Sequence, residues 1–313
     1  MTNFDPGNMR PYRATDLDPL LRFVGECNRT PGASAPPHPG DVVHFMSNTL
    51  RGRDLERHLF LYEEADGRLR ALLTLYPSAP YSYELLVAPD LRGAEVDAFE
   101  AAAMAWADAQ AGRAAAQAGS AAQGCAVEVS AGDAIGEQIV ARLGYSATGA
   151  PGMLYTARSL RDPIPDKPLS QGFSMRPVAG EHEAGLVAAV HNGAFTPKWD
   201  AEQYLAVMRT PGFHIDRELA VVAPDERFAA FVIIWLDPIS RTGLFEPVGC
   251  HRDFQRRGLA SALMYEGMRR MRAAGMETAI VRYNADNIGG VPLYRSVGFQ
   301  TRYAIAEYRK SKT

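Results

Sequence analysis

The alternation of apolar and polar positions predicts a series of strands and helices in the second half of the chain. Apolar or alternating runs predict strands at 173–178, 218–224, 228–237, 243–250, 278–284 and 302–309. Helical periodicity predicts helices at 181–195, 199–210, 259–274 and 291–297. Asp200 is the expected N-cap of the second helix, and Gly275 is expected to end the third. This order predicts an α/β (α+β) fold with a mixed sheet and helices on both faces.

The first half repeats the landmarks of the second half in the same order. Met9-Arg10-Pro11 and Met175-Arg176-Pro177 each open a strand-then-helix pattern. Two later pairs of stretches also align, those that begin at Val87 and Cys250 and those that begin at Ala141 and Arg295. Because the separations are similar, the sequence predicts two copies of one domain.

A linker is predicted between the two copies. Residues 161–173 are rich in proline and polar side chains, which is typical of a linker. The predicted domains are therefore 1–160 and 174–313. Within the first copy, the Pro/Gly/Ser-rich stretch 28–40 predicts a mobile loop, and the alanine-rich stretch 109–124 predicts a helix end that runs into a turn.

Composition and charge narrow the classes of partner. The net charge of −3 and the lack of long basic runs argue against nucleic acid or an anionic membrane. The sequence has no apolar run of the roughly 20 residues that span a bilayer and no export signal, so a cytoplasmic protein is expected. Cys27, Cys125 and Cys250 are widely spaced, as free thiols are, and the histidines show no metal-ligand spacing, so no metal is expected. The sequence leaves a monomer and a homodimer open.

Residues 255–260, Gln-Arg-Arg-Gly-Leu-Ala, form a turn between a predicted strand and a predicted helix. Backbone N–H groups at the start of a helix lack partners and lie at the positive end of its dipole, so the turn predicts an anion-binding site. Gly258 lets backbone approach a ligand closely, and Arg252, Arg256 and Arg257 add positive charge. The spacing fits neither G-x-x-x-x-G-K-[ST] nor G-x-G-x-x-G. An ordinary helix entry without a ligand is the alternative.

Gln255, Gly258 and Ala260 fit the pattern [Q/R]-x-x-G-x-[G/A], and the turn resembles the acetyl-CoA pyrophosphate loop of the GNAT N-acetyltransferase superfamily. Downstream, Asn287 and residues 293–299 look like that family's N-x-x-A-x-x-x-Y-x-x-x-G-F segment. The resemblance covers the second copy and, in a weaker form, the first. It implies two tandem domains, each with a mostly antiparallel sheet that is splayed between its two central strands. The chain is similar to tandem members of the mycothiol-synthase type in its length and in which half keeps the family's motifs intact.

The resemblance implies roles for particular residues in binding acetyl-CoA. Backbone N–H groups of 256–260 would hold the pyrophosphate, and the strand edge at 248–250 would pair with the amides of pantetheine. The implied cofactor-binding residues are Val248, Gly249, Cys250, Gln255, Arg256, Arg257, Gly258, Leu259, Ala260 and Asn287. Pro247 cannot donate to a sheet ladder, which agrees with a splayed or bulged position. Tyr294 would protonate the departing thiolate, although a packed aromatic residue is the alternative. Gly290 departs from the family's alanine.

Transfer to an amine requires a base, because a primary ammonium keeps its proton to about pH 10. Glu246, on the strand before the turn, would remove that proton, and a structural ion-pair partner is the alternative. The N–H of Val248 or Cys250 would stabilise the tetrahedral oxyanion. Transfer would be direct, since no base is spaced to activate the Cys250 thiol as a nucleophile.

Two further assignments stay open on the sequence alone. Phe195, Trp199 and Tyr204 lie on or near the first helices of the second copy and either line an acceptor pocket or belong to the core. His251 beside the turn is either a solvated turn residue or a hydrogen-bond partner of the cofactor.

The first copy departs from the pattern at the positions that matter for acetyl-CoA. Glu95, Asp97 and Val140 stand where the second copy has the turn glycine, the turn alanine and the tyrosine. A carboxylate would repel a pyrophosphate, and valine has no proton to give. The sequence therefore predicts one working site, in the second copy, which moves an acetyl group from acetyl-CoA to a primary amine of a small molecule or peptide. A non-catalytic acyl-CoA-binding protein on the same fold is the alternative.

Overall fold

The computed structural model describes residues 3–30, 36–92, 97–120, 124–150, 152–196 and 199–310. The chain divides into two compact units, each described by itself below. Unit 1 consists of Met1–Pro37, Gly52–Leu154 and Tyr303–Thr313, and unit 2 consists of His38–Arg51 and Tyr155–Arg302. Each unit thus contains segments of both predicted copies. The limits 1–160 and 174–313 stay a prediction about the repeat, while the compact units follow other boundaries.

Unit 1 is built on a mixed sheet with the strand order β1-β2-β3-β4-β5-β13. Its strands are β1 (Met9–Pro11), β2 (Leu59–Glu63), β3 (Leu69–Tyr76), β4 (Tyr81–Val87), β5 (Cys125–Ser130) and most of β13 (Gln300–Lys310), which also pairs with the short β6 (Ser146–Ala147). Only β4 and β5 are parallel among these neighbours in the described residues. The unit also holds the helices α1 (Leu17–Arg29), α3 (Asp97–Gln117) and α4 (Ala134–Arg142).

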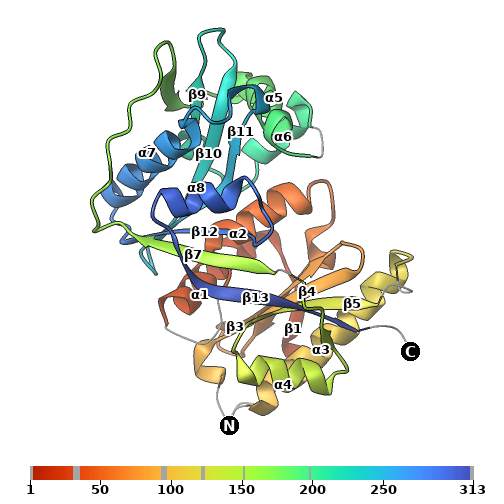
Figure 1. The fold of residues 1–313 in the computed structure, drawn as a ribbon. Helices are drawn as coiled ribbons and strands as arrows, with labels where there is room; N and C mark the ends of the chain where they lie inside the picture. Colours follow the sequence, from red (N-terminus) through yellow and green to blue (C-terminus); the bar gives the residue numbers. More distant parts are fainter. Residues whose placement is uncertain are drawn as a thin grey trace. The chain divides into compact units, whose positions relative to one another are not determined.

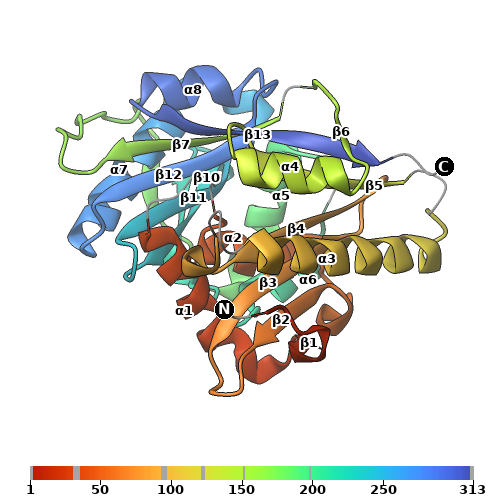
Figure 2. The ribbon, with the colours of Figure 1, turned by 90° about the horizontal axis from the view of Figure 1, so that it is seen from below.

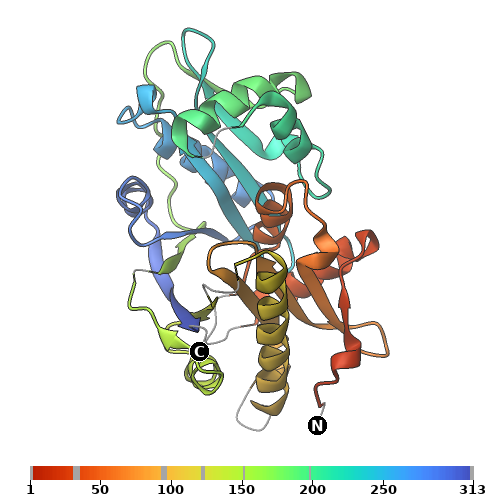
Figure 3. The ribbon, with the colours of Figure 1, turned by 90° about the vertical axis from the view of Figure 1, so that its right-hand side faces the viewer.

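Helix α3 packs along β4 and is the long helix of unit 1 in Figures 2 and 3. Ala107, Ala111 and Ala115 follow one another at one-turn spacing and are almost completely buried in the core of the unit. Small methyl side chains allow the helix to lie close to the sheet. The helix ends at Gln117, and Gly119, with a φ of 71°, follows in the turn. This confirms the helix end predicted for the alanine-rich stretch.

Unit 2 has the strand order β7-β12-β11-β10-β9-β8. Its strands are β8 (Ser174–Pro177), β9 (Glu218–Val222), β10 (Phe228–Asp237), β11 (Thr242–Cys250), β12 (Thr278–Asn284) and residues 155–159 of β7 (Met153–Ser159). Strands β11 and β12 are parallel, whereas β8, β9, β10 and β11 pair in antiparallel fashion. The unit also holds the helices α2 (Pro39–His44), α5 (Ala184–Ala194), α6 (Ala201–Met208), α7 (Leu259–Ala273) and α8 (Gly290–Ser296).

Different helices cover the two faces of the unit 2 sheet (Figure 1). On one face, α7 approaches β11 so closely that a Cβ on Gly267 would stand 2.4 Å from Cε1 of Phe245. On the other face, which α5 and α6 cover, a Cβ on Gly249 would stand 2.3 Å from Cε1 of Phe231. Phe245 and Gly249 face opposite sides because β11 carries one extra residue against β10 around Pro247. This bulge is one of the positions expected for a proline in a strand.

The two units exchange strands along the chain. In unit 2, the Oγ1 of Thr156 on β7 donates to the carbonyl of Val281 on β12 at 3.0 Å. The guanidinium of Arg158 donates to the carbonyl of Val297 at 2.6 Å and to that of Pro163 at 2.6 Å. In unit 1, residues 305–310 of β13 pair with β5. Strand β7, from the first half of the sequence, therefore completes the sheet of unit 2. Strand β13, from the second half, completes the sheet of unit 1.

The prediction of a mobile loop over 28–40 is wrong for its last residues. The ring Nδ1 of His38 accepts the N–H of Gly40 at 2.9 Å, and a carboxylate oxygen of Asp41 accepts the N–H of His38 at 2.7 Å. These two bonds form a capping box that starts α2, with Pro39 in its first turn. Proline and glycine here begin a helix, and residues 31–35 lie outside the described part of the chain.

The elements predicted for the second half are confirmed. Helix α6 begins after Asp200, whose carboxylate accepts the N–H of Gln203 at 2.8 Å. Helix α7 ends at Ala273, and Gly275 follows with a φ of 87°. The mixed, mostly antiparallel sheet with helices on both faces is the fold class that the sequence predicts.

Candidate active site

The central strands of unit 2 separate partway along their length. In the described residues, β11 pairs with β12 only from Thr242 to Leu244, although β11 continues to Cys250. The N–H of His251 donates to the carbonyl of Ala229 at 2.9 Å, so alternation along the antiparallel ladder turns the N–H groups of Val248 and Cys250 away from β10. These groups face the opening between β11 and β12. The splay implied by the resemblance is thus present.

The glycine turn at the end of β11 forms a backbone cradle at the start of α7. Gly258 is the N-cap with a φ of 74°, and Arg256 two residues earlier also has a positive φ, of 62°. Positive φ is costly for a non-glycine residue, so this turn has an unusual backbone conformation. Leu259 is buried and anchors the first turn of α7 in the core. The arrangement is suited to an anion.

Lys167 is a candidate binding residue that the sequence analysis did not identify. It is exposed in the predicted linker, which belongs to unit 2. A Cβ on Gly258 would lie 2.9 Å from Cε and 3.2 Å from Nζ of Lys167, so the ammonium lies directly against the cradle. The carbonyl of Pro165 accepts from Arg269 of α7 at 2.8 Å and holds the linker in place. The sequence analysis missed this residue because it lies far from the glycine turn in the sequence.

Two of the arginines near the turn have other partners. Arg252 donates to the carbonyls of Asn192 and Gly193 at 3.3 and 3.4 Å, which places its charge at the C-terminal end of α5. Arg257 lies over the rings of Phe173 and Phe254, 5.9 and 5.7 Å from their centroids. This position also suits the negative end of the helix dipole, and the phosphate contact of Arg252 stays a prediction.

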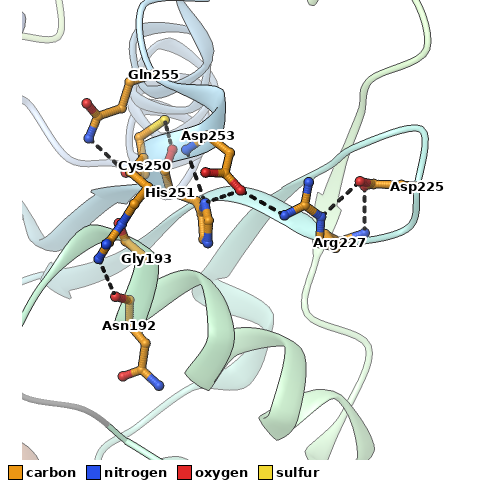
Figure 4. Close-up of polar contacts among 9 residues, drawn as sticks. Asn192, Gly193, Asp225, Arg227, Cys250, His251, Asp253 and Gln255 are labelled. Atoms are coloured by element: carbon orange, nitrogen blue, oxygen red, sulfur yellow. Dashed lines mark hydrogen bonds and ion pairs between the residues drawn. The ribbon is translucent and has the colours of Figure 1, made fainter.

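Figure 4 shows the polar contacts that fix the strand end before the turn. The amide of Gln255 donates to the carbonyl of Cys250 at 3.4 Å, a long contact that ties the turn back to β11. The ring Nδ1 of His251 accepts the N–H of Asp253 at 3.2 Å. A Cβ on Gly193 would stand 1.8 Å from Cδ2 of His251, so the ring packs on α5. This contact favours a structural role for His251.

Glu246 lies in the bulge of β11, with its backbone held in place. Nε1 of Trp235 donates to the carbonyl of Glu246 at 2.6 Å. The side chain of Glu246 is 27% exposed, so it is mostly enclosed but partly accessible to solvent. Burial, with a smaller effect of the Asp41 carboxylate, raises the pKa of Glu246 to about 8, and Arg282 opposes this shift. A carboxyl group with this pKa is a stronger base than an exposed glutamate.

His44 of α2 lies beside Glu246, and the sequence analysis did not identify it. Its Nε2 is 3.5 Å from Oε1 of Glu246, and its side chain is 19% exposed. Burial lowers the pKa of His44 to about 4, so its imidazole is neutral near pH 7. Because α2 comes from the first half of the sequence, no local motif connects His44 with the glycine turn.

Tyr294 of α8 is buried and packs against Tyr283 of β12, with 4.6 Å between ring centroids. Burial, then the charges of Glu246 and Tyr283, hold the pKa of Tyr294 well above its usual range. Its hydroxyl therefore keeps its proton at neutral pH and is a donor. Both the packed-aromatic and the proton-donor interpretations fit this environment.

Asn287 shapes the entry to α8. Its Oδ1 accepts the N–H of Gly290 at 2.8 Å. A Cβ on Gly290 would stand 2.6 Å from Nδ2 of Asn287 and 2.9 Å from the ring of Tyr294. The glycine that departs from the family's alanine is therefore required by close packing at this position.

The aromatic residues near α5 and α6 pack in the core. Trp199 and Tyr204 are 7% and 2% exposed, and both rings pack around His191 of α5. Phe195 is partly buried against the same cluster. Of the two interpretations left open, the core is the one that these contacts favour. Cys250 is partly buried, and burial raises the pKa of its thiol to about 11, which disfavours a nucleophilic thiolate.

Unit 1 has a comparable splay with different chemistry. Strands β4 and β5 pair only over Tyr81–Tyr83 and Cys125–Val127. Beyond this pairing, a cavity of about 60 Å³ is lined by residues of both strands. Arg92 at this cavity donates to Glu100 at 2.9 Å and to Asp133 at 2.6 Å. Two carboxylates for one guanidinium leave a negative balance, which disfavours an anion.

The first-copy residues expected to prevent acetyl-CoA binding are only partly described. Val140 is completely buried in the core of unit 1, where it has no polar function. Glu95 lies outside the described residues. Asp97 is the first residue of α3, and its side chain is not among those described.

Two features are absent from the described residues. Among them, no group of three or more His, Cys, Asp and Glu side chains is arranged to hold a metal ion. No described helix is long and apolar enough to cross a membrane.

Comparisons with known proteins agree with this geometry. Residues 187–299 match the family model described as acetyltransferase (GNAT) family. A mycothiol acetyltransferase of Streptomyces bingchenggensis is 26% identical over 331 residues, covering 94% of this chain and 93% of that protein. The structure is similar to a GCN5-related N-acetyltransferase from Sphaerobacter thermophilus, with a TM-score of 0.63, 18% identity and coverage of 96% and 94%. It is also similar to a tandem GNAT protein from the clavulanic acid biosynthesis pathway, with a TM-score of 0.62, 16% identity and coverage of 97% and 99%.

Proposed function

We propose, from the premise that residues 187–299 belong to the acetyltransferase (GNAT) family and that the chain has the tandem GNAT fold, that unit 2 is an acetyl-CoA-dependent N-acetyltransferase. The observation that carries the proposal is the backbone cradle at Gly258, placed where the splay of β11 and β12 opens. A cradle of N–H groups suits a pyrophosphate, and the splayed strand edge suits the amides of pantetheine.

The cofactor would be held mainly by backbone. N–H groups from Arg256 to Ala260 would bind the pyrophosphate, and the edge of β11 at 248–250 would pair with pantetheine. Lys167 would add a charge-assisted contact to a phosphate oxygen, since its ammonium already lies against Gly258. Gln255 and Asn287 would act by shaping the turn and the start of α8, because each bonds to backbone there.

The reaction would use Glu246 as base and Tyr294 as acid. Glu246 would take a proton from the ammonium of the acceptor, which leaves a nitrogen lone pair free to attack the thioester carbon. The N–H of Val248 or Cys250 would stabilise the oxyanion. As the C–S bond breaks, the sulfur would receive the bonding electrons and then the proton of Tyr294. The nitrogen would lose its second proton to solvent as the amide forms, and solvent would return a proton to the tyrosinate. One ammonium and one acetyl-CoA would thus give one amide, one CoA thiol and one released proton. The raised pKa of Glu246 and the protonated state of Tyr294 support these two roles.

The acceptor would be a primary amine of a small molecule or peptide. The relative named mycothiol acetyltransferase extends over most of this chain, which supports a small-molecule amine. Unit 1 would have no acetyl-CoA site of its own, because Arg92 is already bound by two carboxylates.

Calorimetric titration of the full chain with acetyl-CoA tests the cofactor assignment. We expect one site per chain, lost in Gly258→Glu, because that change adds a carboxylate to the cradle. Gly275→Glu is the matched control, since Gly275 also has a positive φ but lies at the far end of α7 with open space around it. Two sites would contradict the proposed role of unit 1. No binding would mean that the fold serves another ligand.

Release of free CoA thiol with a panel of primary amines tests catalysis. Glu246→Gln and Tyr294→Phe are each expected to lower kcat by about 10²- to 10⁴-fold. An unchanged rate in Tyr294→Phe would exclude its role as acid. Binding of acetyl-CoA without turnover on any amine would favour a non-catalytic acyl-CoA-binding protein.

A further inference from the structure

Helix α2 is fixed to the sheet of unit 2 at three points. The ring Nε2 of His38 lies 3.3 Å from the carbonyl of Thr242 on β11. A Cβ on Gly40 would stand 2.3 Å from Cβ of Trp235 on β10, so the helix and the strand are in close contact. Asp41 pairs with Arg282 of β12 at 3.2 Å. Contacts to three neighbouring strands leave little freedom in where the C-terminal end of α2 lies.

That end of α2 carries His44, and its Nε2 has two polar neighbours. The amide nitrogen of Asn48 lies 3.1 Å away, and Oε1 of Glu246 lies 3.5 Å away. The second distance exceeds that of an ordinary hydrogen bond, so the two side chains form one only after a side-chain movement. A neutral imidazole with its Nδ1 protonated offers one Nε2 lone pair as an acceptor, and the amide N–H of Asn48 donates to it at 3.1 Å. An ionised Glu246 would then face a lone pair, whereas a protonated Glu246 would face an acceptor for its O–H.

We propose that His44 is a positioning residue for Glu246: its Nε2 exchanges the amide N–H of Asn48 for the O–H of the protonated carboxyl and holds the base in place for proton transfer. The base of the reaction would then be a carboxyl–imidazole pair assembled from both halves of the sequence. This inference rests on the proposed function for its catalytic meaning. The pairing itself concerns two side chains of unit 2 and is testable without an acceptor.

The other charged groups around the pair have opposing effects: Asp41 favours a charge on His44, and Arg282 favours a charge on Glu246. From α2, Asp41 faces both residues, but its carboxylate is already bound by Arg282 of β12. His191 of α5 disfavours a charge on His44, and Tyr294 of α8 feels the charge of Glu246. Burial is the largest influence on both members of the pair, and it favours the uncharged form of each.

The pair has a definite proton balance during turnover. Before the amine reacts, the O–H proton of Glu246 leaves to solvent, which the partly exposed side chains allow. The ionised carboxylate then takes one proton from the acceptor ammonium and becomes an O–H that again donates to His44. Loss of that proton to solvent after product release restores the base. His44 carries no net proton at any step.

Histidine NMR on the full chain, labelled with ¹³C and ¹⁵N in histidine, tests the pairing. The His44 signal is assigned by its disappearance in His44→Phe. We expect its ring signals to inflect near pH 8 as Glu246 ionises, without the shift change of a full imidazolium. Glu246→Gln should remove the inflection. Glu266→Gln on α7, a matched charge change away from the site, should keep it. A His44 signal that is flat from pH 6 to 10, or that is unchanged in Glu246→Gln, would overturn the proposal.

The pH dependence of kcat/KM gives a second readout once an amine is accepted. His44→Phe keeps apolar bulk but removes the acceptor, so the rising limb should move to lower pH by about one unit and the maximum should fall about tenfold. His44→Gln offers an amide oxygen as acceptor and should restore part of both. Equal pH profiles in the unaltered protein, His44→Phe and His44→Gln would overturn the role of His44 in catalysis. Absence of transfer to any amine would instead count against the proposed function. The NMR result would still decide whether His44 and Glu246 form a pair.

Discussion

At the scale of single residues, two glutamates of unit 2 have similar pKa values and different surroundings. Burial raises the pKa of both Glu218 and Glu246 to about 8. Glu218 has no solvent exposure and accepts a hydrogen bond from the hydroxyl of Tyr204, whereas the side chain of Glu246 is 27% exposed and lies 3.5 Å from His44. A raised pKa alone therefore does not distinguish a structural carboxyl from a catalytic one. Solvent access and the neighbouring side chains distinguish the two.

Glu218 should make the protein less stable as the pH rises. Its folded pKa lies above the ordinary value near 4.5, so between about pH 4.5 and 8 the folded state holds a proton that the unfolded state has released. Stability is then lost by up to about 1.4 kcal/mol per pH unit across this window. Urea unfolding at pH 5 and pH 8 should show a smaller difference for Glu218→Gln than for the unaltered protein. An equal difference would mean that Glu218 is ionised in the folded state.

Lys167 should contribute to cofactor affinity through charge. Lys167→Ala is expected to weaken acetyl-CoA binding about three- to tenfold at low salt and to reduce the salt dependence of Kd. Calorimetry at two ionic strengths measures both. Arg161→Ala is the control, because Arg161 lies in the same linker but pairs with Glu277. Tighter binding by Lys167→Ala would show that the side chain blocks the cradle.

At the scale of secondary structure elements, glycines in helices have unequal roles. Gly267 of α7 faces Phe245, whereas Gly112 of α3 has no atom within 4 Å of an added Cβ. One glycine allows a helix to approach the sheet, and the other leaves the helix without a stabilising side chain. The sequence pattern does not distinguish them, since both lie inside alanine-rich or methionine-rich helical stretches.

The two glycines should respond oppositely to alanine. Gly267→Ala forces a Cβ to within 2.4 Å of an aromatic carbon and is expected to lower stability by about 1–3 kcal/mol. Gly112→Ala should raise stability by about 0.5–1 kcal/mol through helix propensity. Thermal unfolding of the two variants under the same conditions gives the comparison. A stabilised Gly267→Ala would mean that α7 moves easily on the sheet.

At the scale of the whole molecule, the chain folds by exchanging segments between its halves. Unit 2 contains α2 and most of β7, which come from the first half of the sequence. Unit 1 contains most of β13, the last strand of the chain. Each unit is therefore incomplete without the other half of the sequence.

A fragment of residues 161–313 should not fold into a stable unit 2. It lacks Thr156 and Arg158 of β7, which bond to Val281 and Val297, and it lacks the whole of α2. We expect little protection in hydrogen exchange for the fragment alone and recovery when residues 1–160 are co-expressed with it. A fragment that binds acetyl-CoA like the full chain would show that the exchanged segments are dispensable.

The sequence by itself determined the local parts of the protein. Periodicity predicted the strands and helices of the second half, Gly275 predicted the end of α7, and Pro247 predicted a departure from regular pairing. The glycine turn was predicted because its residues are contiguous. The roles assigned to it, to Glu246 and to Tyr294 stay predictions until ligand and rate are measured.

Only the tertiary structure decided which distant segments meet. His44, Lys167 and β7 lie far from Gly258 in the sequence and carry no motif, because their positions depend on packing against several strands at once. A proline-glycine stretch was expected to be a loop, but His38 and Asp41 cap it into a helix. Local periodicity fixes an element because its hydrogen bonds are local, whereas a site depends on side chains that only the packed core brings together.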